Sequence, residues 1–125
     1  MRPIVCIVAP DAGLREGVTA VLTRLGAGVR AFGTAREFLA SLAEAMPACV
    51  IADSQLPDMT GLALLQELRA RGLALPTILL ASEADISGAV TAMRAGAVDV
   101  IEKPYLDRVL ALQVAPLLGL DTRTV

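Results

Sequence analysis

Residues 49–61 read CVIADSQLPDMTG and place a carboxylate at the end of an otherwise apolar run. The run is apolar on both faces, which is typical of a strand in a parallel sheet covered by helices on both sides. Asp53 follows at once, and Pro57 and Gly61 interrupt the chain before the next helical pattern. The stretch therefore predicts a short buried strand that ends on an acidic residue.

The same alternation recurs along the whole chain. Short apolar runs are followed by longer segments of helical period, and the pattern repeats five times. Right-handed crossovers between parallel strands then predict a three-layer, doubly wound α/β fold, with two helices on one face of a five-stranded sheet and three on the other. The expected strands are 3–9, 28–32, 49–53, 77–81 and 98–102, and the expected helices are 11–25, 34–45, 61–71, 85–95 and 105–118.

Length and composition limit the classes of function. The chain has 125 residues, 55% of them hydrophobic, which predicts one domain, placed at residues 1–118, with 119–125 as a C-terminal exit segment. A net charge of −2 without a basic run argues against direct nucleic-acid binding. Because the apolar runs are too short to cross a membrane and the N-terminus does not open a signal peptide, we expect a cytoplasmic protein.

The histidine and cysteine content limits the kinds of catalytic and metal-binding chemistry that the chain can perform. The sequence contains no histidine, which excludes histidine-based triads, histidine zinc sites and a phosphohistidine donor role. Cys6 and Cys49 each lie in an apolar run and make no metal-ligand spacing, so we expect buried, reduced thiols. Carboxylates, lysine or hydroxyl groups must carry any chemistry.

Two charged residues directly follow expected strands. Asp53 comes after the third strand and Lys103 after the fifth, and in an open α/β sheet ligands bind beyond these carboxyl ends. A carboxylate there can attack phosphorus to form an acyl phosphate, and a neighbouring ammonium can hold the phosphoryl oxygens. Each residue taken alone is also explained as a loop cap or a surface charge, but their expected convergence favours a site.

The sequence carries the five β/α repeats, Asp53, Pro57 and Gly61, and the stretch AMRAGAVDVIEKP at 92–104. On these features it resembles the receiver domain of bacterial response regulators over essentially the whole chain. The resemblance implies a CheY-like parallel sheet of order 2-1-3-4-5. It also implies Asp53 as the phosphoacceptor, Lys103 as a phosphate contact, and a histidine kinase or phosphotransfer protein as partner. Residues 92–104 are most similar to receivers of the nitrogen-fixation regulator type, which implies an output domain outside this chain, of the helix-turn-helix kind.

The sequence departs from this family at the expected metal site. The family's acidic pair falls on Ala9 and Pro10, whose methyl group and ring cannot replace the carboxylates that hold Mg²⁺. Asp11 comes one position late, so it either reaches inward to bind Mg²⁺ together with Asp53 or caps the next helix, which is the preferred interpretation. We therefore expect Mg²⁺ binding to be weak or absent.

The sequence also departs from the family at the switch positions. The family's hydroxyl falls on Ala81, and Ser82 replaces it as a phosphate contact only if the strand ends earlier or the loop shifts register. The switch aromatic, three residues before Lys103, is Val100, which has no ring to turn inward. Asp85 and Asp107 are expected to be solvated helix caps.

These features favour an atypical, degenerate receiver domain rather than an enzyme. It would act through protein contacts, with impaired phosphorylation of Asp53 and a candidate homodimer surface on the fourth and fifth helices. The alternative is an ordinary phospho-switch in which Asp11 and Ser82 substitute for the missing groups. A remote alternative is a small enzyme with Asp53 as nucleophile, which would need a second carboxylate where this chain has Gln55.

Overall fold

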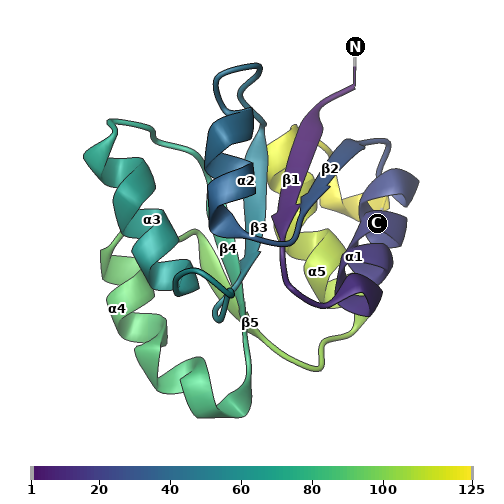
Figure 1. The fold of residues 1–125 in the computed structure, drawn as a ribbon. Coiled ribbons are helices and arrows are strands. Elements are labelled where there is room, and N and C mark those ends of the chain that lie inside the picture. The colour runs from purple at the N-terminus through teal and green to yellow at the C-terminus, as the bar shows by residue number, and fades with distance from the viewer. Residues whose placement is uncertain (1, 125) are drawn as a thin grey trace.

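The computed structural model describes residues 2–124 and places one sheet between two layers of helices (Figure 1). All strand pairs are parallel, and the order is β2-β1-β3-β4-β5, which confirms the expected sheet. The strands are β1 (Ile4–Val8), β2 (Gly28–Phe32), β3 (Cys49–Asp53), β4 (Thr77–Ala81) and β5 (Asp99–Glu102). The three central strands are almost fully buried, whereas the edge strands β2 and β5 are only partly buried.

The helices cover the sheet unequally. In Figure 1, α1 and α5 lie on one face and α2, α3 and α4 on the other, as expected from the sequence. Asp11, Thr34 and Thr60 begin three of them, because each side chain accepts a hydrogen bond from a backbone N–H two or three residues further on. The helices are α1 (Ala12–Arg24), α2 (Ala35–Ser41), α3 (Gly61–Ala70), α4 (Ala89–Arg94) and α5 (Asp107–Val114).

The fourth and fifth helices begin differently from the prediction. Glu83–Gly88 form the 3₁₀ helix η1, and α4 starts only at Ala89, so Asp85 does not cap an α-helix. The carboxylate of Asp85 is directed instead at hydroxyl groups on two loops. Asp107 is exposed but is not a cap either: the N-cap of α5 is Leu106, and Asp107 forms an ion pair with Arg24 at 3.2 Å. Both expected caps were wrong.

Two hydrophobic layers hold the sheet. Every residue of β3 and β4 is buried, so side chains that alternate along these strands fill both layers. Ile51 faces the layer of α1 and α5, and Val50 faces the layer of α2, α3 and α4. Cys6 and Cys49 are free and buried, and burial raises the pKa of Cys6 to about 11 and that of Cys49 to about 12. Both thiols are therefore neutral at pH 7, and their being free and buried confirms the prediction.

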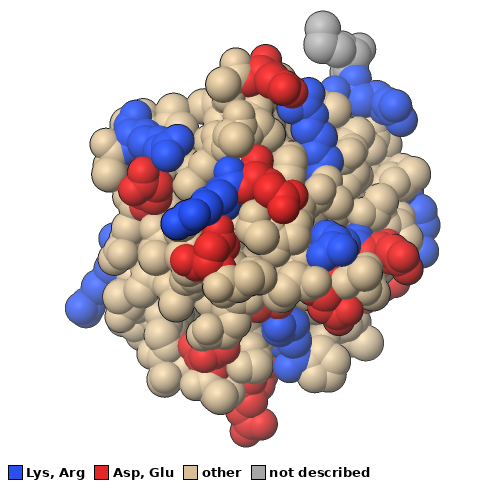
Figure 2. All heavy atoms as spheres, viewed as in Figure 1, with Lys and Arg blue, Asp and Glu red and all other residues tan. Residues whose placement is uncertain are grey.

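The surface carries mixed charge. On the face seen in Figure 2, lysine and arginine side chains are interspersed with aspartate and glutamate, and no extended basic patch stands out. Such a face lacks the single-sign field that attracts a nucleic-acid backbone. Among residues 2–124, no helix is long and apolar enough to cross a membrane.

Candidate functional site

Asp53 and Lys103 meet at the carboxyl edge of the sheet. The Asp53 side chain is only 6% exposed, and its Oδ2 lies 2.7 Å from Lys103 Nζ. Its Oδ1 accepts a hydrogen bond from the backbone N–H of Gln55 at 2.9 Å. A buried carboxylate is costly unless it is paired and hydrogen-bonded, and both conditions are met here. The predicted approach of Asp53 and Lys103 is confirmed, while their roles toward phosphate remain predictions.

Backbone hydrogen bonds fix the two residues at this edge. Lys103 follows β5, and its N–H donates to the carbonyl of Ala81 at 2.7 Å, so β4 positions the lysine. The N–H of Ser54 donates to the carbonyl of Leu80 at 2.8 Å, which continues the β3–β4 pairing past Asp53. The peptide bond between Lys103 and Pro104 is cis. Both charged side chains therefore project from backbone that the sheet itself holds in place.

The loop after Asp53 is tied to the neighbouring helix. The carboxylate of Asp58 accepts hydrogen bonds from the N–H groups of Ala35 and Arg36, at 3.0 and 2.9 Å, at the start of α2. These backbone donors, that of Ala35 above all, lower the pKa of Asp58. The loop that carries Gln55 is thus bound, through Asp58, to the N-terminus of α2.

Gly61 closes this loop against β3 and leaves no room for a side chain. Its N–H donates to the carbonyl of Ser54 at 2.9 Å, and a Cβ on it would lie 2.6 Å from the backbone oxygen of Asp53. We expect Gly61→Ala to lower the free energy of unfolding by about 2–3 kcal/mol, because the backbone at Asp53 must shift. Urea denaturation measures this change.

Gly17 provides the matched control for that substitution. It lies inside α1, and a Cβ built on it meets nothing within 4 Å. Gly17→Ala should therefore raise the stability by about 0.5–1 kcal/mol, as expected for alanine in a helix. Equal effects of the two substitutions would show that Gly61 is not a close-packing position.

The loop between β1 and α1 lacks the acidic pair and is bound by a cationic side chain from α1. Ala9 is buried, Pro10 is exposed, and the guanidinium of Arg15 donates to their carbonyl oxygens at 2.6 and 3.0 Å. Asp11 is exposed and accepts a hydrogen bond from the N–H of Gly13 at 3.0 Å, so its preferred interpretation as a helix cap is confirmed. The sequence analysis missed Arg15; the available signal was a basic residue near the helix N-terminus, where acidic residues are favoured.

These residues do not fit the Mg²⁺ site that the family resemblance implies. Mg²⁺ takes near-octahedral oxygen ligands and usually one or two carboxylates from the protein. Within residues 2–124, no three His, Cys, Asp or Glu side chains are placed to share a metal ion. Asp11 caps its own helix, and the guanidinium of Arg15 in α1 is bound to the loop carbonyls. At the position of the family's metal site, Asp53 is thus left without the acidic pair that would complete the ligand set.

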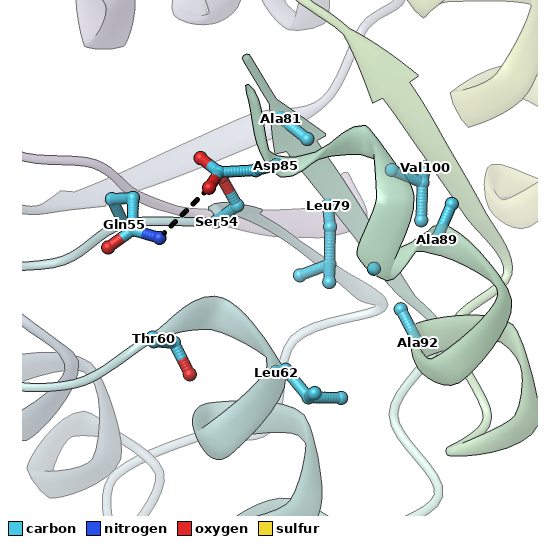
Figure 3. A pocket seen from close by; sticks show the side chains of 11 residues that line it. Ser54, Gln55, Thr60, Leu62, Leu79, Ala81, Asp85, Ala89, Ala92 and Val100 are labelled. Carbon is cyan, nitrogen blue, oxygen red and sulfur yellow. Dashed lines mark hydrogen bonds between the residues drawn. The ribbon is translucent and has the colours of Figure 1, made fainter. Parts of the chain in front are cut away.

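Asp85 is an unpredicted member of the site. Its Oδ2 accepts hydrogen bonds from the hydroxyl groups of Ser82 and Ser54, both at 3.0 Å. Its Oδ1 accepts one from Gln55 Nε2 at 3.3 Å, which Figure 3 shows as a dashed line. The hydrogen bonds from Ser82 and Ser54 lower its pKa, so the carboxylate is ionised at neutral pH. Asp85 therefore joins the loop after β3 to the loop after β4.

The switch positions have the small residues expected from the sequence. β4 ends at Ala81, so the earlier strand end that would let Ser82 replace the missing hydroxyl does not occur. The Ser82 hydroxyl donates to Asp85 instead, and a phosphate contact by Ser82 remains a prediction. Ala81 and Val100 line a cavity next to Asp85 (Figure 3). At the positions where the family resemblance implies a hydroxyl group and an aromatic ring, this chain has a methyl and an isopropyl group, which leave part of the cavity unfilled.

Comparison with known proteins agrees with this geometry. Residues 5–115 match the family model described as response regulator receiver domain. Nodulation protein W of Bradyrhizobium diazoefficiens is 36% identical over 109 residues, which cover 87% of this chain and 48% of that protein. The DNA-binding transcriptional regulator NtrC of Salmonella typhimurium is 35% identical over 112 residues, which cover 89% of this chain and 24% of that protein. The chain thus spans about half or less of these relatives.

Solved structures show the same fold. The structure titled FixJ-N superposes with a TM-score of 0.84 at 32% identity and covers 95% of both chains. A response regulator from Chloroflexus aurantiacus gives a TM-score of 0.88 at 29% identity, with 95% of this chain and 99% of that chain covered. The sheet order, the paired Asp53 and Lys103 and these likenesses lead to one conclusion. The chain belongs to the response regulator receiver domain family of two-component signalling.

Proposed function

We propose that this receiver domain is atypical: Asp53 accepts a phosphoryl group, its Mg²⁺-dependent phosphorylation is impaired, and the domain signals mainly through protein contacts. The observation that supports this most strongly is the loop after β1. There, Ala9 and Pro10 replace carboxylates, and the guanidinium of Arg15 binds the loop carbonyls. A loop that has lost its carboxylate pair and lies against a guanidinium is expected to bind a divalent cation only weakly.

The paired side chains suit phosphoryl transfer to a carboxylate. An oxygen of Asp53 would attack phosphorus and form a P–O bond while the bond to the donor breaks and its electron pair leaves with the donor. Lys103 would move from Asp53 Oδ2 to a phosphoryl oxygen, a shift that its ammonium group can make without leaving the edge. One ammonium neutralises less charge than an ammonium and a metal ion together, so we expect the transfer to be slow.

The phosphoryl donor would be a histidine kinase or a phosphotransfer protein. The chain contains no histidine and cannot supply a phosphohistidine itself. NtrC is named a DNA-binding regulator and FixJ a transcriptional regulatory protein. By analogy we propose an output domain outside this chain, of the helix-turn-helix kind, with no direct nucleic-acid contact by the receiver. A cytoplasmic location remains a prediction.

The surface of α4, β5 and α5 is the proposed contact face. Several large apolar side chains are exposed there, and apolar groups gathered on a surface mark protein-binding sites. The face suits a partner protein or a second copy of the chain, and the proposed homodimer would use it. The exposed residues are Val90, Met93, Val98, Leu106 and Val109.

The other candidate functions have less support. An ordinary phospho-switch needs Asp11 and Ser82 at the phosphate, but Asp11 caps α1 and the Ser82 hydroxyl donates to Asp85. An enzyme with an aspartyl nucleophile needs an acid–base carboxylate at the position of Gln55, whose amide donates to Asp85.

A titration with Mg²⁺, followed by amide NMR, tests the proposal. We expect the chain to show no saturable shift near Asp53 at millimolar Mg²⁺, since one carboxylate and a nearby guanidinium are poor ligands. Arg15→Gln should strengthen binding only a few-fold, because it removes repulsion without adding a ligand. Saturable binding at micromolar Mg²⁺, with shifts at Asp53 and Asp11, would contradict the proposal.

A further inference from the structure

A cavity of about 170 Å³ lies between the loop after β3, the start of α3, and the segment η1–α4 (Figure 3). One side of it is apolar and is formed by Leu62, Leu79, Ala89, Ala92 and Val100. An apolar cavity of about 150 Å³ in another protein is large enough to bind benzene. The space is therefore the size of one aromatic ring with a short substituent.

The small size of particular side chains creates this space. Ala81 ends β4 and Val100 lies on β5, at the positions where the family resemblance implies a hydroxyl and an aromatic ring. Ala92 of α4, only 3% exposed, contributes a third small side chain. Since the chain supplies no ring to fill the cavity, a ring from another molecule can occupy it.

The opposite side of the cavity is polar and anionic. Ser54, Gln55, Thr60 and Asp85 line it, and in Figure 3 Ser54, Gln55 and Asp85 lie together at the end of the cavity away from Ala92. A carboxylate offers about four acceptor positions, and the described hydrogen bonds of Asp85 use three of them. Oδ1 accepts a single hydrogen bond, at 3.3 Å, and so has room for another donor.

Asp85 has no cation in direct contact among the described residues, although, besides the hydrogen bond from Ser82, the nearby charge of Lys103 contributes to its lowered pKa. No ion pair of residues 2–124 includes it, and the ammonium group of Lys103 is bound to Asp53 at 2.7 Å. An ionised carboxylate at the edge of an apolar cavity favours a ligand with an apolar body and a cationic head.

We propose that this cavity binds a small organic cation: an aromatic ring with a primary ammonium group on a short linker. The ring would pack between Leu79, Ala92 and Val100, and the ammonium group would donate to Asp85 Oδ1. The proposal goes beyond phosphorylation of Asp53 and does not depend on it. A ligand here would join η1 and α4 to the loop after Asp53, next to the proposed contact face.

Three probes of one shape test the charge preference by amide chemical-shift titration of the whole chain. 2-Phenylethylamine is the cation, 2-phenylethanol its neutral counterpart, and 3-phenylpropionate the anion. We expect saturable shifts at Asp85, Ala92 and Val100, with the amine binding about tenfold more tightly than the alcohol. The anion should not bind. No shift at these residues at millimolar amine, or equal binding of amine and anion, would overturn the proposal.

Substitutions test separately the contribution of the Asp85 charge and that of the cavity volume to ligand binding. Asp85→Asn should weaken amine binding about tenfold and leave alcohol binding unchanged, whereas Glu83→Gln removes an exposed charge from the same 3₁₀ helix and should alter neither. Ala92→Leu fills the cavity and should abolish binding of both probes, and Ala89→Leu at its more exposed edge repeats this test if the first variant folds poorly. A folded, filled variant that still binds the amine as tightly as the parent contradicts the proposed site.

Discussion

The double variant Ala9→Asp, Pro10→Asp is expected to phosphorylate about a hundredfold faster than the parent when given Mg²⁺ and a small phosphodonor. The two carboxylates would hold a metal ion that neutralises the incoming phosphoryl group, whereas in the parent Lys103 alone would do so. Intact mass against time gives the rate, and the same variant carrying Asp53→Asn is the control that should gain no phosphate.

The double variant has a structural cost that must be measured with it. Ala9 is fully buried, so a carboxylate there loses hydration, and we expect a stability loss of about 1–3 kcal/mol. The guanidinium of Arg15 on the loop carbonyls offers a counter-charge that reduces this loss. A folded double variant that binds Mg²⁺ and never gains phosphate would show that Asp53 is retained only for structure.

Restored phosphorylation should still produce little conformational change. Ala81 has no hydroxyl to move toward a phosphate, and Val100 has no ring to turn into the vacated space. Asp85 also ties the loops after β3 and β4 together before any phosphate arrives. Amide-exchange protection of α4 and α5 should therefore stay the same in the phosphorylated double variant.

Lys103→Met is expected to lower the free energy of unfolding by about 2–3 kcal/mol at pH 7. The substitution leaves the carboxylate of Asp53, 6% exposed, with only the N–H of Gln55 as a described partner. The lysine is 29% exposed, so water compensates part of the lost ion pair and the effect stays below that of a fully buried pair. Urea denaturation at constant ionic strength measures the loss.

A double-mutant cycle isolates the ion pair from the packing of each side chain. Asp53→Asn combined with Lys103→Met should cost less than the sum of the two single changes, by about 1–2 kcal/mol. Arg24→Met with Asp107→Asn is the matched exposed pair, at 3.2 Å with both side chains 65% exposed, and its coupling should be below about 0.5 kcal/mol. Additive effects at Asp53 and Lys103 would show that the pair contributes nothing to stability.

The sheet could be predicted from the sequence because its determinants are local. Runs such as 49–53 and 77–81 are apolar except for Asp53 and Thr77 at their ends, and both strands were found at those bounds. The convergence of Asp53 and Lys103 was also predictable, since parallel strands end at one edge. The start of α4 was not, because the side chain of Asp85 accepts hydrogen bonds from Ser82 and from the distant loop after β3 instead of capping the helix.

The remaining parts of the site depend on contacts that appear only in the folded chain and that no local sequence pattern predicts. Arg15 lies near a helix N-terminus, and only the folded loop shows that its guanidinium reaches the carbonyls of Ala9 and Pro10. Ser54 and Asp85 are 31 positions apart in sequence, so neither identifies the other. The sequence did predict which groups are missing, but not the cavity that their absence leaves beside Val100.

The most direct measurement is the intact mass of the unmodified chain after incubation with Mg²⁺ and a small phosphodonor, beside the Asp53→Asn variant. We expect a slow, partial gain of one phosphoryl group on the parent, no gain on the variant, and little dependence on millimolar Mg²⁺. Rapid, complete phosphorylation that requires Mg²⁺, together with loss of amide protection in α4 and α5, would contradict the account and indicate an ordinary switch.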